Sequence, residues 1–471
     1  MISKIIKFIH AASGTIIFWI LIFFLIRLTG ITNPPLETEH NWRQCFTAMI
    51  ARNFLEQSPN ILYPQIDMAG NQAGFIGSEF PLFNYIIFLV AKIFGYQHWY
   101  GRLINLIISS IGIYFFALLV EKLFDRTVAF ASGIILLSSI WFSFSRKIMP
   151  DTFSISLMFI GLYFCYTYIK TGSITNLLLF ILFGSLSTLS KIPAISYISL
   201  LAIPVFSKQL TINKKVGIII AGVMVFIITA LWYFFWVPYL VETYHNQLFW
   251  PKSLVQGLKE LIQYWPETLE KFYFASLHSY IALVCFLAGI YLITKNKYKL
   301  LAYILGVYSI AFILFILKSG LTFSHHSYYI IPFTPIMALT CGYAVSRLSA
   351  RFQYILLFVI ALEGILNQQH DFFISKTELY KLDLESIADT VSHKDDLIII
   401  NGGTNPQQLY FTHRKGWTVK NDVLEENRKL NDLKDKEAKY IFINRESYQN
   451  TLDYPLIFQN DNFNIYKLTG Q

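Results

Sequence analysis

The sequence has few charged residues for its length. Charged side chains make up 14% of the 471 residues, whereas 55% are hydrophobic and the mean hydropathy is +0.48. A soluble domain usually carries about 25% charged residues, so composition excludes an ordinary soluble protein. Apolar stretches such as 16–26, 103–120 and 216–236 can largely cross a hydrocarbon core of roughly 30 Å. We therefore expect a polytopic α-helical membrane protein.

Cysteine pairs and cofactor motifs are also missing. The sequence contains no Walker loop, dinucleotide fingerprint or HExxH pattern. The first apolar stretch precedes no small-residue cleavage pattern, so we expect it to remain as a membrane span. No disulfide framework or zinc spacing is visible among the four cysteines, which are Cys45, Cys165, Cys285 and Cys341.

Eleven apolar stretches are candidate membrane spans. A twelfth, 82–95, is short for a span and is typical of an interfacial or re-entrant helix. The candidates are 8–29, 101–120, 127–146, 151–170, 174–190, 192–207, 215–236, 278–294, 300–317, 326–346 and 353–366.

Loop charge favours eleven crossings, because lysine and arginine collect in cytoplasmic loops. If 82–95 does not cross, the short outer loops carry only Arg146, Lys147, Lys191 and Lys318. The N-terminus is then cytoplasmic and the C-terminus extracytoplasmic. The net charge of +9 has this origin, and we expect no nucleic-acid partner. The inner ends would carry Lys4, Lys7, Lys122, Arg126, Lys170, Lys208, Lys214, Lys215, Lys295, Lys297, Lys299, Arg347 and Arg351.

This topology predicts two domains. A transmembrane catalytic domain spans 1–370, with long outer loops at 30–100 and 237–277. In the first loop, apolar residues from Trp42 to Phe54 recur at helical spacing, which predicts a helix lying in the membrane interface. The residues after it, through Gly77, are expected to be irregular. Short β-like runs at 397–400 and 440–443, with a charged helix near 421–437, predict a small α/β domain over 371–471.

The most informative segment is Glu37-Thr-Glu-His-Asn-Trp-Arg-Gln44, which follows the first span. A carboxylate at this place is suited to accept a proton from an acceptor hydroxyl, or to hold a metal. It is equally suited to cap the following helix. His40, Arg43 and Gln44 favour the chemical interpretation, and both Glu37 and Glu39 are candidates for the base.

Other polar residues fall on the same predicted outer face. Glu79 and Asp151 each stand at the start of an apolar helix, either as N-terminal charges or as site residues. Lys191 either snorkels to the interface or binds a lipid-borne phosphate, and Arg102, Arg146 and Lys147 could contribute similarly. The adjacent His325 and His326, near Tyr329, cannot share one helix face. They suit hydrogen bonding to a sugar or phosphate.

These residues resemble a known family. The motif Glu37-x-x-His40-x-Trp-Arg-Gln44 is similar to the acidic first-loop motif of GT-C glycosyltransferases of the protein O-mannosyltransferase and aminoarabinose (lipid A) transferase superfamily, closest to the bacterial family 39 branch. The resemblance covers about 5–350. Further matching segments follow in the family's order: Ala51-Arg-Asn-Phe54, Glu79-Phe-Pro-Leu82, Gly101-Arg-Leu103, Met149-Pro-Asp151, Ser190-Lys191 and His325-His-Ser-Tyr-Tyr-Ile-Ile-Pro332.

The resemblance implies transfer of one sugar from a polyprenyl (undecaprenyl) phosphate carrier to a lipid, glycan or protein acceptor outside the bacterial inner membrane, with inversion. Glu37 takes the catalytic acidic position, which is usually Asp in relatives, and Glu39 is the alternative. Phe80 stands where the lipid A branch can have lysine. The implied substrate-binding residues are His40, Arg43, Gln44, Glu79, Arg102, Asp151, Lys191, His325, His326 and Tyr329.

A divalent metal is a candidate cofactor rather than a required one. Its implied ligands are Glu79, Asp151, His325 and His326. The alternative function is a transporter or polymerase of lipid-linked glycans. A transporter typically has charges near the midplane, broken helices and repeat symmetry, whereas the charges here gather at one predicted face.

Overall fold

The computed structural model describes residues 13–248 and 251–468. The start of the predicted span 8–29 lies outside the described residues, as do Lys4 and Lys7. The chain forms two compact units. Unit 1 contains the described residues of Met1–Ile31, Gly101–Phe234 and Phe249–Phe372, and unit 2 contains Thr32–Tyr100, Phe235–Leu248 and the described part of Phe373–Gln471.

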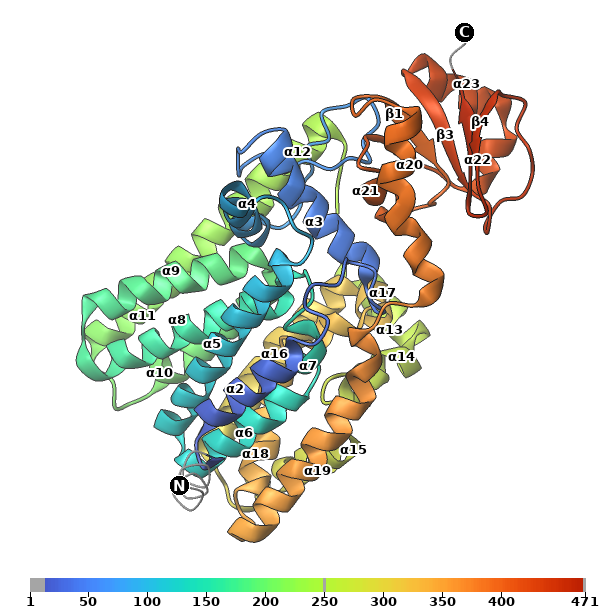
Figure 1. The fold of residues 1–471 in the computed structure, drawn as a ribbon. Helices are drawn as coiled ribbons and strands as arrows, with labels where there is room; N and C mark the ends of the chain where they lie inside the picture. Colours follow the sequence, from blue (N-terminus) through green and yellow to red (C-terminus); the bar gives the residue numbers. More distant parts are fainter. Residues whose placement is uncertain (1–12, 249–250, 469–471) are drawn as a thin grey trace. The chain divides into compact units, whose positions relative to one another are not determined.

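Unit 1 is entirely helical in its described part (Figure 1). Its apolar side chains continue to the surface, where Leu21, Val284, Ile310 and Phe358 are all more than half exposed. Such exposure is typical of helices solvated by lipid. The helices are α2 (Ile16–Arg27), α5 (Tyr100–Leu123), α6 (Arg126–Ser138), α7 (Trp141–Phe144), α8 (Pro150–Thr171), α9 (Ile174–Ser190), η1 (Ile192–Leu201), α10 (Ala202–Phe206), α11 (Ile212–Ala230), η2 (Leu231–Trp236), α13 (Leu254–Gln263), α14 (Trp265–Glu270), η3 (Lys271–Ala275), α15 (Tyr280–Lys295), α16 (Lys299–Ser319), α17 (Leu321–His325), η4 (Ser327–Ile330), α18 (Thr334–Val345), α19 (Ala350–Gln368) and η5 (Gln369–Phe372).

Five continuous helices in the described chain are long and apolar enough to cross a membrane, fewer than the eleven predicted spans. They are Tyr100–Leu123, Pro150–Thr171, Ile212–Tyr244, Lys299–Ser319 and Ala350–Phe372. A pair bent by 91°, Trp265–Ala275 with Tyr280–Lys295, makes a sixth. The other predicted spans are present as shorter apolar helices. Several of these predicted spans are divided between two helical segments. The chain is a multi-pass membrane protein, and the count of eleven crossings stays a prediction.

Helices α8 and α9 form an antiparallel hairpin that positions two candidate site residues. Small residues bring the two backbones close together, as in many membrane helix pairs. The hydroxyl of Ser154 donates to the carbonyl of Ser187 at 2.9 Å, and the hydroxyl of Ser187 donates back to the carbonyl of Ser154 at 2.7 Å. Because the hairpin is antiparallel, the first turn of α8 and the last turn of α9 lie at the same end.

Unit 2 combines the first long loop with the C-terminal tail. Its sheet has the order β2-β1-β3-β5-β4, with β1 parallel to β2 and β3, and β5 antiparallel to β3 and β4 (Figure 1). The predicted strands and the charged helical stretch are confirmed. The elements are α3 (Asn41–Glu56), α4 (Leu82–Phe94), α12 (Val237–Tyr244), η6 (Lys376–Asp383), α20 (Leu384–Val391), β1 (Leu397–Ile400), α21 (Gln407–Thr412), β2 (Gly416–Thr418), α22 (Asn421–Glu425), α23 (Asn427–Asp435), β3 (Ala438–Asn444), β4 (Leu456–Gln459) and β5 (Phe463–Lys467).

Alternation along the strands gives the sheet two apolar faces, because successive side chains point to opposite sides. Ile398 and Ile400 pack in one cluster with residues of α20, α21 and α3. Ile399 packs in a second cluster with Leu424 and Leu430 from α22 and α23. The small α/β fold predicted for the tail is therefore present, and helix α3 of the first loop is part of one of its two cores.

The prediction that helix 42–54 lies in the membrane interface is wrong. A helix at an interface exposes one face, whereas every residue of α3 from Arg43 to Phe54 is buried. Its polar residues find partners inside unit 2. Arg52 Nη2 lies 2.9 Å from Asp67 Oδ2 and its Nη1 donates to the Tyr410 carbonyl at 3.1 Å, while Asn53 donates to Asp67 Oδ1 at 2.8 Å.

The segment after α3, through Gly77, is irregular as predicted, and Gly70 is held by a hydrogen bond from its N–H to the Gly416 carbonyl at 2.8 Å. The second long outer loop, 237–277, contains the helical segments α12, α13, α14 and η3. The predicted helix 82–95 is α4, whose 13 residues reach only about 20 Å at 1.5 Å per residue.

Candidate functional site

In unit 2, the Glu37 motif is held in place by backbone contacts with the tail. Glu37 pairs with Ile374 in an isolated antiparallel bridge, and the Thr38 N–H donates to the Phe373 carbonyl at 3.2 Å. The Glu37 side chain is fully buried, and Asn33 Nδ2 donates to its Oε1 at 3.1 Å. The leading carboxylate of the motif is therefore fixed in position by Asn33 of the first loop and by the start of the tail.

The turn that follows has an unusual backbone. Glu39 and His40 have φ values of 65° and 56°, so two consecutive residues with side chains adopt the left-handed region. Such conformations cost free energy and persist where the surrounding structure holds them. The turn brings Glu39 Oε2 within 3.4 Å of His40 Nε2, and the Glu39 side chain is 39% exposed. Of the two candidate bases, Glu37 is enclosed and Glu39 is accessible.

Arg43 and Glu79 come from two separate segments of the first loop and form a buried ion pair. Arg43 lies in the first turn of α3, and its guanidinium carbon is also 5.4 Å from the centroid of the Phe46 ring. Glu79 lies two residues before Pro81, the N-cap residue of α4. The sequence-based candidates Glu37, Arg43, Gln44 and Glu79 are therefore all buried residues of unit 2, which polar side chains rarely are without a specific role or partner.

In unit 1, Asp151 and Lys191 form the corresponding charged pair. Asp151 lies in the first turn of α8 behind Pro150, and Lys191 follows the last residue of α9. Lys191 Nζ lies 3.7 Å from Asp151 Oδ1 and 5.6 Å from the centroid of the Tyr328 ring. The side chains are 15% and 7% exposed for Lys191 and Asp151 respectively. A snorkelling lysine would extend to water, so the enclosed contact favours the site interpretation.

The two histidines diverge at a break in the chain. His325 ends α17 and its ring contacts Tyr264, with centroids 5.2 Å apart, whereas His326 has an extended backbone and stacks on Tyr328 at 5.3 Å. Tyr329 also contacts the His326 ring. Among the residues that the structure describes, Asp151, His325 and His326 do not bring ligand atoms within 4.8 Å of one another. The implied metal site, which also includes Glu79, stays a prediction.

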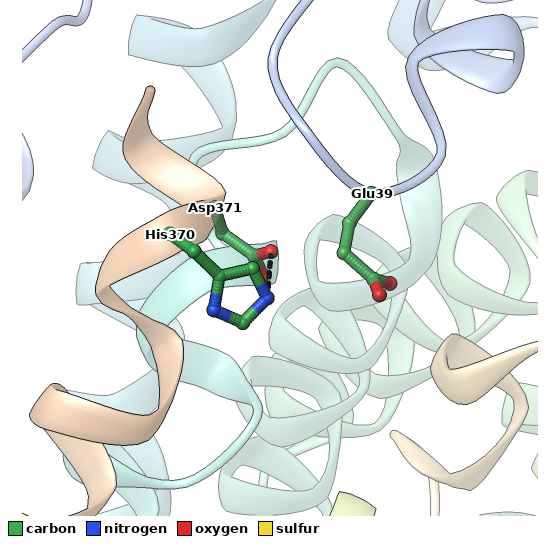
Figure 2. Close-up of side chains that lie close together, drawn as sticks. All are labelled: Glu39, His370 and Asp371. Atoms are coloured by element: carbon green, nitrogen blue, oxygen red, sulfur yellow. Dashed lines mark ion pairs between the residues drawn. The ribbon is translucent and has the colours of Figure 1, made fainter. Parts of the chain in front are cut away.

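Unit 1 holds a further buried acidic residue that the sequence analysis missed. Asp371 is 4% exposed, with Oδ2 at 3.8 Å from Lys147 Nζ and Oδ1 at 3.2 Å from His370 Nε2. Figure 2 shows the pairing of His370 with Asp371 on η5. Arg146 lies 4.2 Å above the Phe372 ring. The available signal was an acidic residue directly after the last apolar stretch. Arg102, a sequence-based candidate, is fully buried in the first turn of α5.

The fold is of the ArnT-like GT-C type, as the sequence resemblance implies. The family model described as dolichyl-phosphate-mannose-protein mannosyltransferase matches residues 78–234. This segment contains Glu79, Arg102, Asp151 and Lys191. No curated protein sequence matches the chain.

Solved structures share the fold over nearly the whole chain. ArnT from Cupriavidus metallidurans bound to undecaprenyl phosphate has a TM-score of 0.63 and 13% identity, with 95% of this chain and 98% of that chain covered. The apo state of the same protein has a TM-score of 0.61 and 14% identity, with 97% of this chain and 98% of that chain covered. The Archaeoglobus fulgidus oligosaccharyltransferase in complex with Zn and sulfate has a TM-score of 0.60 and 12% identity, with 91% of this chain and 68% of that chain covered.

Proposed function

We propose that the chain transfers one sugar from a polyprenyl-phosphate donor to an acceptor on the outer face of the bacterial inner membrane, with inversion at the anomeric carbon. The observation that carries the proposal is the enclosed Asp151–Lys191 pair at the end of the α8–α9 hairpin, within the segment that matches the mannosyltransferase family. The shared fold with ArnT bound to undecaprenyl phosphate supports a lipid-borne donor. The acceptor is a lipid, a glycan or a protein.

The chemistry requires a base and a stabilised leaving group. The acceptor hydroxyl becomes nucleophilic when a carboxylate accepts its proton. As it attacks the anomeric carbon, the bond to the carrier phosphate breaks and negative charge grows on the departing phosphate, which a nearby cation stabilises. Glu37 or Glu39 would supply the base, and Lys191 the cation. One displacement of this kind inverts the anomeric configuration.

The remaining site residues would bind and orient the substrates. Arg43 is held by Glu79, and Arg102 is buried in the first turn of α5, so both cations are restricted in position. His40, Gln44, His326 and Tyr329 offer hydrogen bonds to sugar hydroxyls or phosphate. Glu79, Asp151, His325 and His326 are the candidate ligands of a divalent metal, and no step above is assigned to that metal. A divalent metal remains a candidate to be tested by chelation.

We further propose two domains with boundaries near those expected from the sequence: a membrane-embedded catalytic domain over 1–370 and an extracytoplasmic α/β domain over 371–471. The N-terminus would be cytoplasmic. The change from unit 1 to unit 2 at Phe372–Phe373 supports this boundary. Reporter fusions after residues 208 and 471 test the orientation, which predicts a cytoplasmic signal for the first and an extracytoplasmic signal for the second.

The proposal is tested with a panel of radiolabelled donors presented to the purified chain together with membrane acceptors. We expect transfer from a polyprenyl-phosphate sugar and none from nucleotide sugars. Glu37→Gln and Glu39→Gln then identify the base, because only the variant that lacks it loses turnover while its thermal unfolding midpoint is unchanged. Movement of an intact lipid-linked sugar across proteoliposomes, without transfer, would support the alternative of a transporter.

A further inference from the structure

Unit 1 contains an apolar groove away from the charged residues described above. It has a volume of about 350 Å³ and lies between the η1–α10 segment and helix α11. Every lining residue is apolar or glycine, including Leu201, Val205, Ile218 and Phe226. Its size lies at the lower end of the roughly 300–1,000 Å³ that is usual for small-molecule sites. Aqueous polar ligands would find no hydrogen-bonding partner among these side chains.

The groove is open to the exposed apolar surface of unit 1. Among its lining residues, Ile219, Val223 and Phe226 are 48%, 49% and 53% exposed. The absence of a side chain at Gly222 keeps the groove hollow, because an added Cβ would lie only 3.0 Å from Leu201 Cδ1. An apolar, elongated ligand can therefore enter from the bilayer without displacing a helix.

Cations stand at one end of this groove. Lys215 precedes Ile218 by three residues and Gly222 by seven, so these residues share one face of α11. Lys208 is exposed two residues after the end of α10. Lys214 is turned away, because its Nζ donates to the carbonyl of Ile169 at the end of α8, at 2.6 Å. No acidic residue occurs in 192–236, so the local charge is positive.

We propose that an anionic glycerophospholipid binds here, with one acyl chain in the groove and its phosphate beside Lys208 and Lys215. Basic clusters next to membrane helices attract anionic headgroups through their positive charge. The apolar lining favours an acyl chain, and the two lysines favour a negatively charged headgroup. This lipid is distinct from the polyprenyl-phosphate donor, so the site is independent of the proposed function.

Native mass spectrometry of the purified full-length chain tests the site. Phosphatidylglycerol and phosphatidylcholine with identical acyl chains are added at equal concentrations. We expect phosphatidylglycerol to bind at least ten-fold more tightly to the unaltered chain. Lys208→Gln combined with Lys215→Gln removes this preference, whereas the matched control Lys299→Gln, an exposed lysine at the start of α16, keeps it.

A second variant tests the contact with the acyl chain separately from the contact with the headgroup. Gly222→Leu fills the groove and should weaken the binding of both phospholipids about ten-fold, while the preference for phosphatidylglycerol over phosphatidylcholine is retained. If this variant does not fold, the surface lysine variants still decide the headgroup contact. Equal binding of the two lipids to the unaltered chain, or a preference that survives the double lysine substitution, overturns the proposal. Displacement of phosphatidylglycerol by equimolar polyprenyl phosphate also overturns it, since the groove would then hold the donor.

Discussion

The carboxylate of Glu79 and the guanidinium of Arg43 form an ion pair inside unit 2, where their side chains are 9% and 4% exposed. The pair joins the helix that follows the Glu37 motif to the residues that lead into α4. It thereby fixes the start of α3 against the segment before α4. Arg43 and Glu79, which the sequence singles out separately, therefore hold each other's side chain in position.

Breaking the Arg43–Glu79 pair should strongly destabilise the protein. Removal of one partner leaves an uncompensated buried charge, which costs about 3–5 kcal/mol. We expect Arg43→Met and Glu79→Met each to lower the thermal unfolding midpoint of the purified chain, and the double variant to recover much of the loss. Purely additive effects in this double-mutant cycle would show that the two side chains are not coupled.

Lys191 should act on turnover through its positive charge. Without a cation, the charge that develops on the departing phosphate is less stabilised, and removal of one such group typically costs about 10²–10³ in kcat. We expect Lys191→Met to show this loss and Lys191→Arg to retain part of the activity. The exposed Lys122→Met, in the last turn of α5, is the control. Unchanged kcat in Lys191→Met would exclude Lys191 from the reaction.

A histidine in unit 2 should make stability depend on pH. His413 Nδ1 lies 2.6 Å from Glu385 Oε1, and Nε2 lies 2.8 Å from Glu56 Oε2. The hydrogen bonds with Glu385 and Glu56 raise the pKa of His413, and the bond with His413 lowers the pKa of Glu385 to about 2. Burial by itself would raise the pKa of Glu56, but the hydrogen bond and charge of His413 lower it overall.

The raised pKa of His413 and the lowered pKa values of Glu56 and Glu385 affect stability in different pH ranges. A raised histidine pKa gives stability that is complete below the ordinary value of about 6.5 and is lost as the pH rises through the folded-state value. The lowered glutamate pKa values give stability that is complete above about 4.5 and is lost as the pH falls. Thermal unfolding should therefore show that His413→Gln costs most between about pH 4.5 and 6.5. A cost that is the same at pH 9, or equal to that of His393→Gln, would contradict this.

Gly257 should be essential for the packing of α13 on α16. A Cβ at this position would lie 1.7 Å from the carbonyl oxygen of Leu317, which no side-chain rotation can relieve. We expect Gly257→Ala to lower the thermal unfolding midpoint clearly. Gly306→Ala is the matched control within α16, because nothing lies within 4 Å of its added Cβ. There the change should stabilise the helix by about 0.5–1 kcal/mol. Equal effects of the two substitutions would contradict the close contact.

Local patterns predicted the helices and strands well, because they depend on neighbours in the sequence. The run Leu397–Ile400 and the start of α8 at Pro150 were both recognisable from residue type alone. The burial of α3 could not be recognised from the sequence, because its polar residues resemble a solvated face. They are satisfied by partners far along the chain, such as the Tyr410 carbonyl that accepts from Arg52. Periodicity alone cannot distinguish a solvated polar face from one with specific buried partners.

The candidate site was predictable in its residues but not in its pairings. The sequence indicated Asp151 and Lys191 separately, and the antiparallel α8–α9 hairpin brings them together. Their assignment to the reaction remains a prediction. The chain breaks between His325 and His326 and turns their rings toward different neighbours. Their implied role as metal ligands stays a prediction. Asp371 was missed because a single acidic residue after an apolar stretch carries no pattern.

The most direct test of the proposed transfer counts two products at once. Purified protein is given a polyprenyl-phosphate sugar labelled on both the sugar and the carrier, together with membrane acceptors. The proposed reaction requires equal amounts of sugar transferred to acceptor and of polyprenyl phosphate released, with the anomeric configuration of the sugar inverted. Carrier that remains attached to its sugar, or a product with retained configuration, would contradict the proposed reaction.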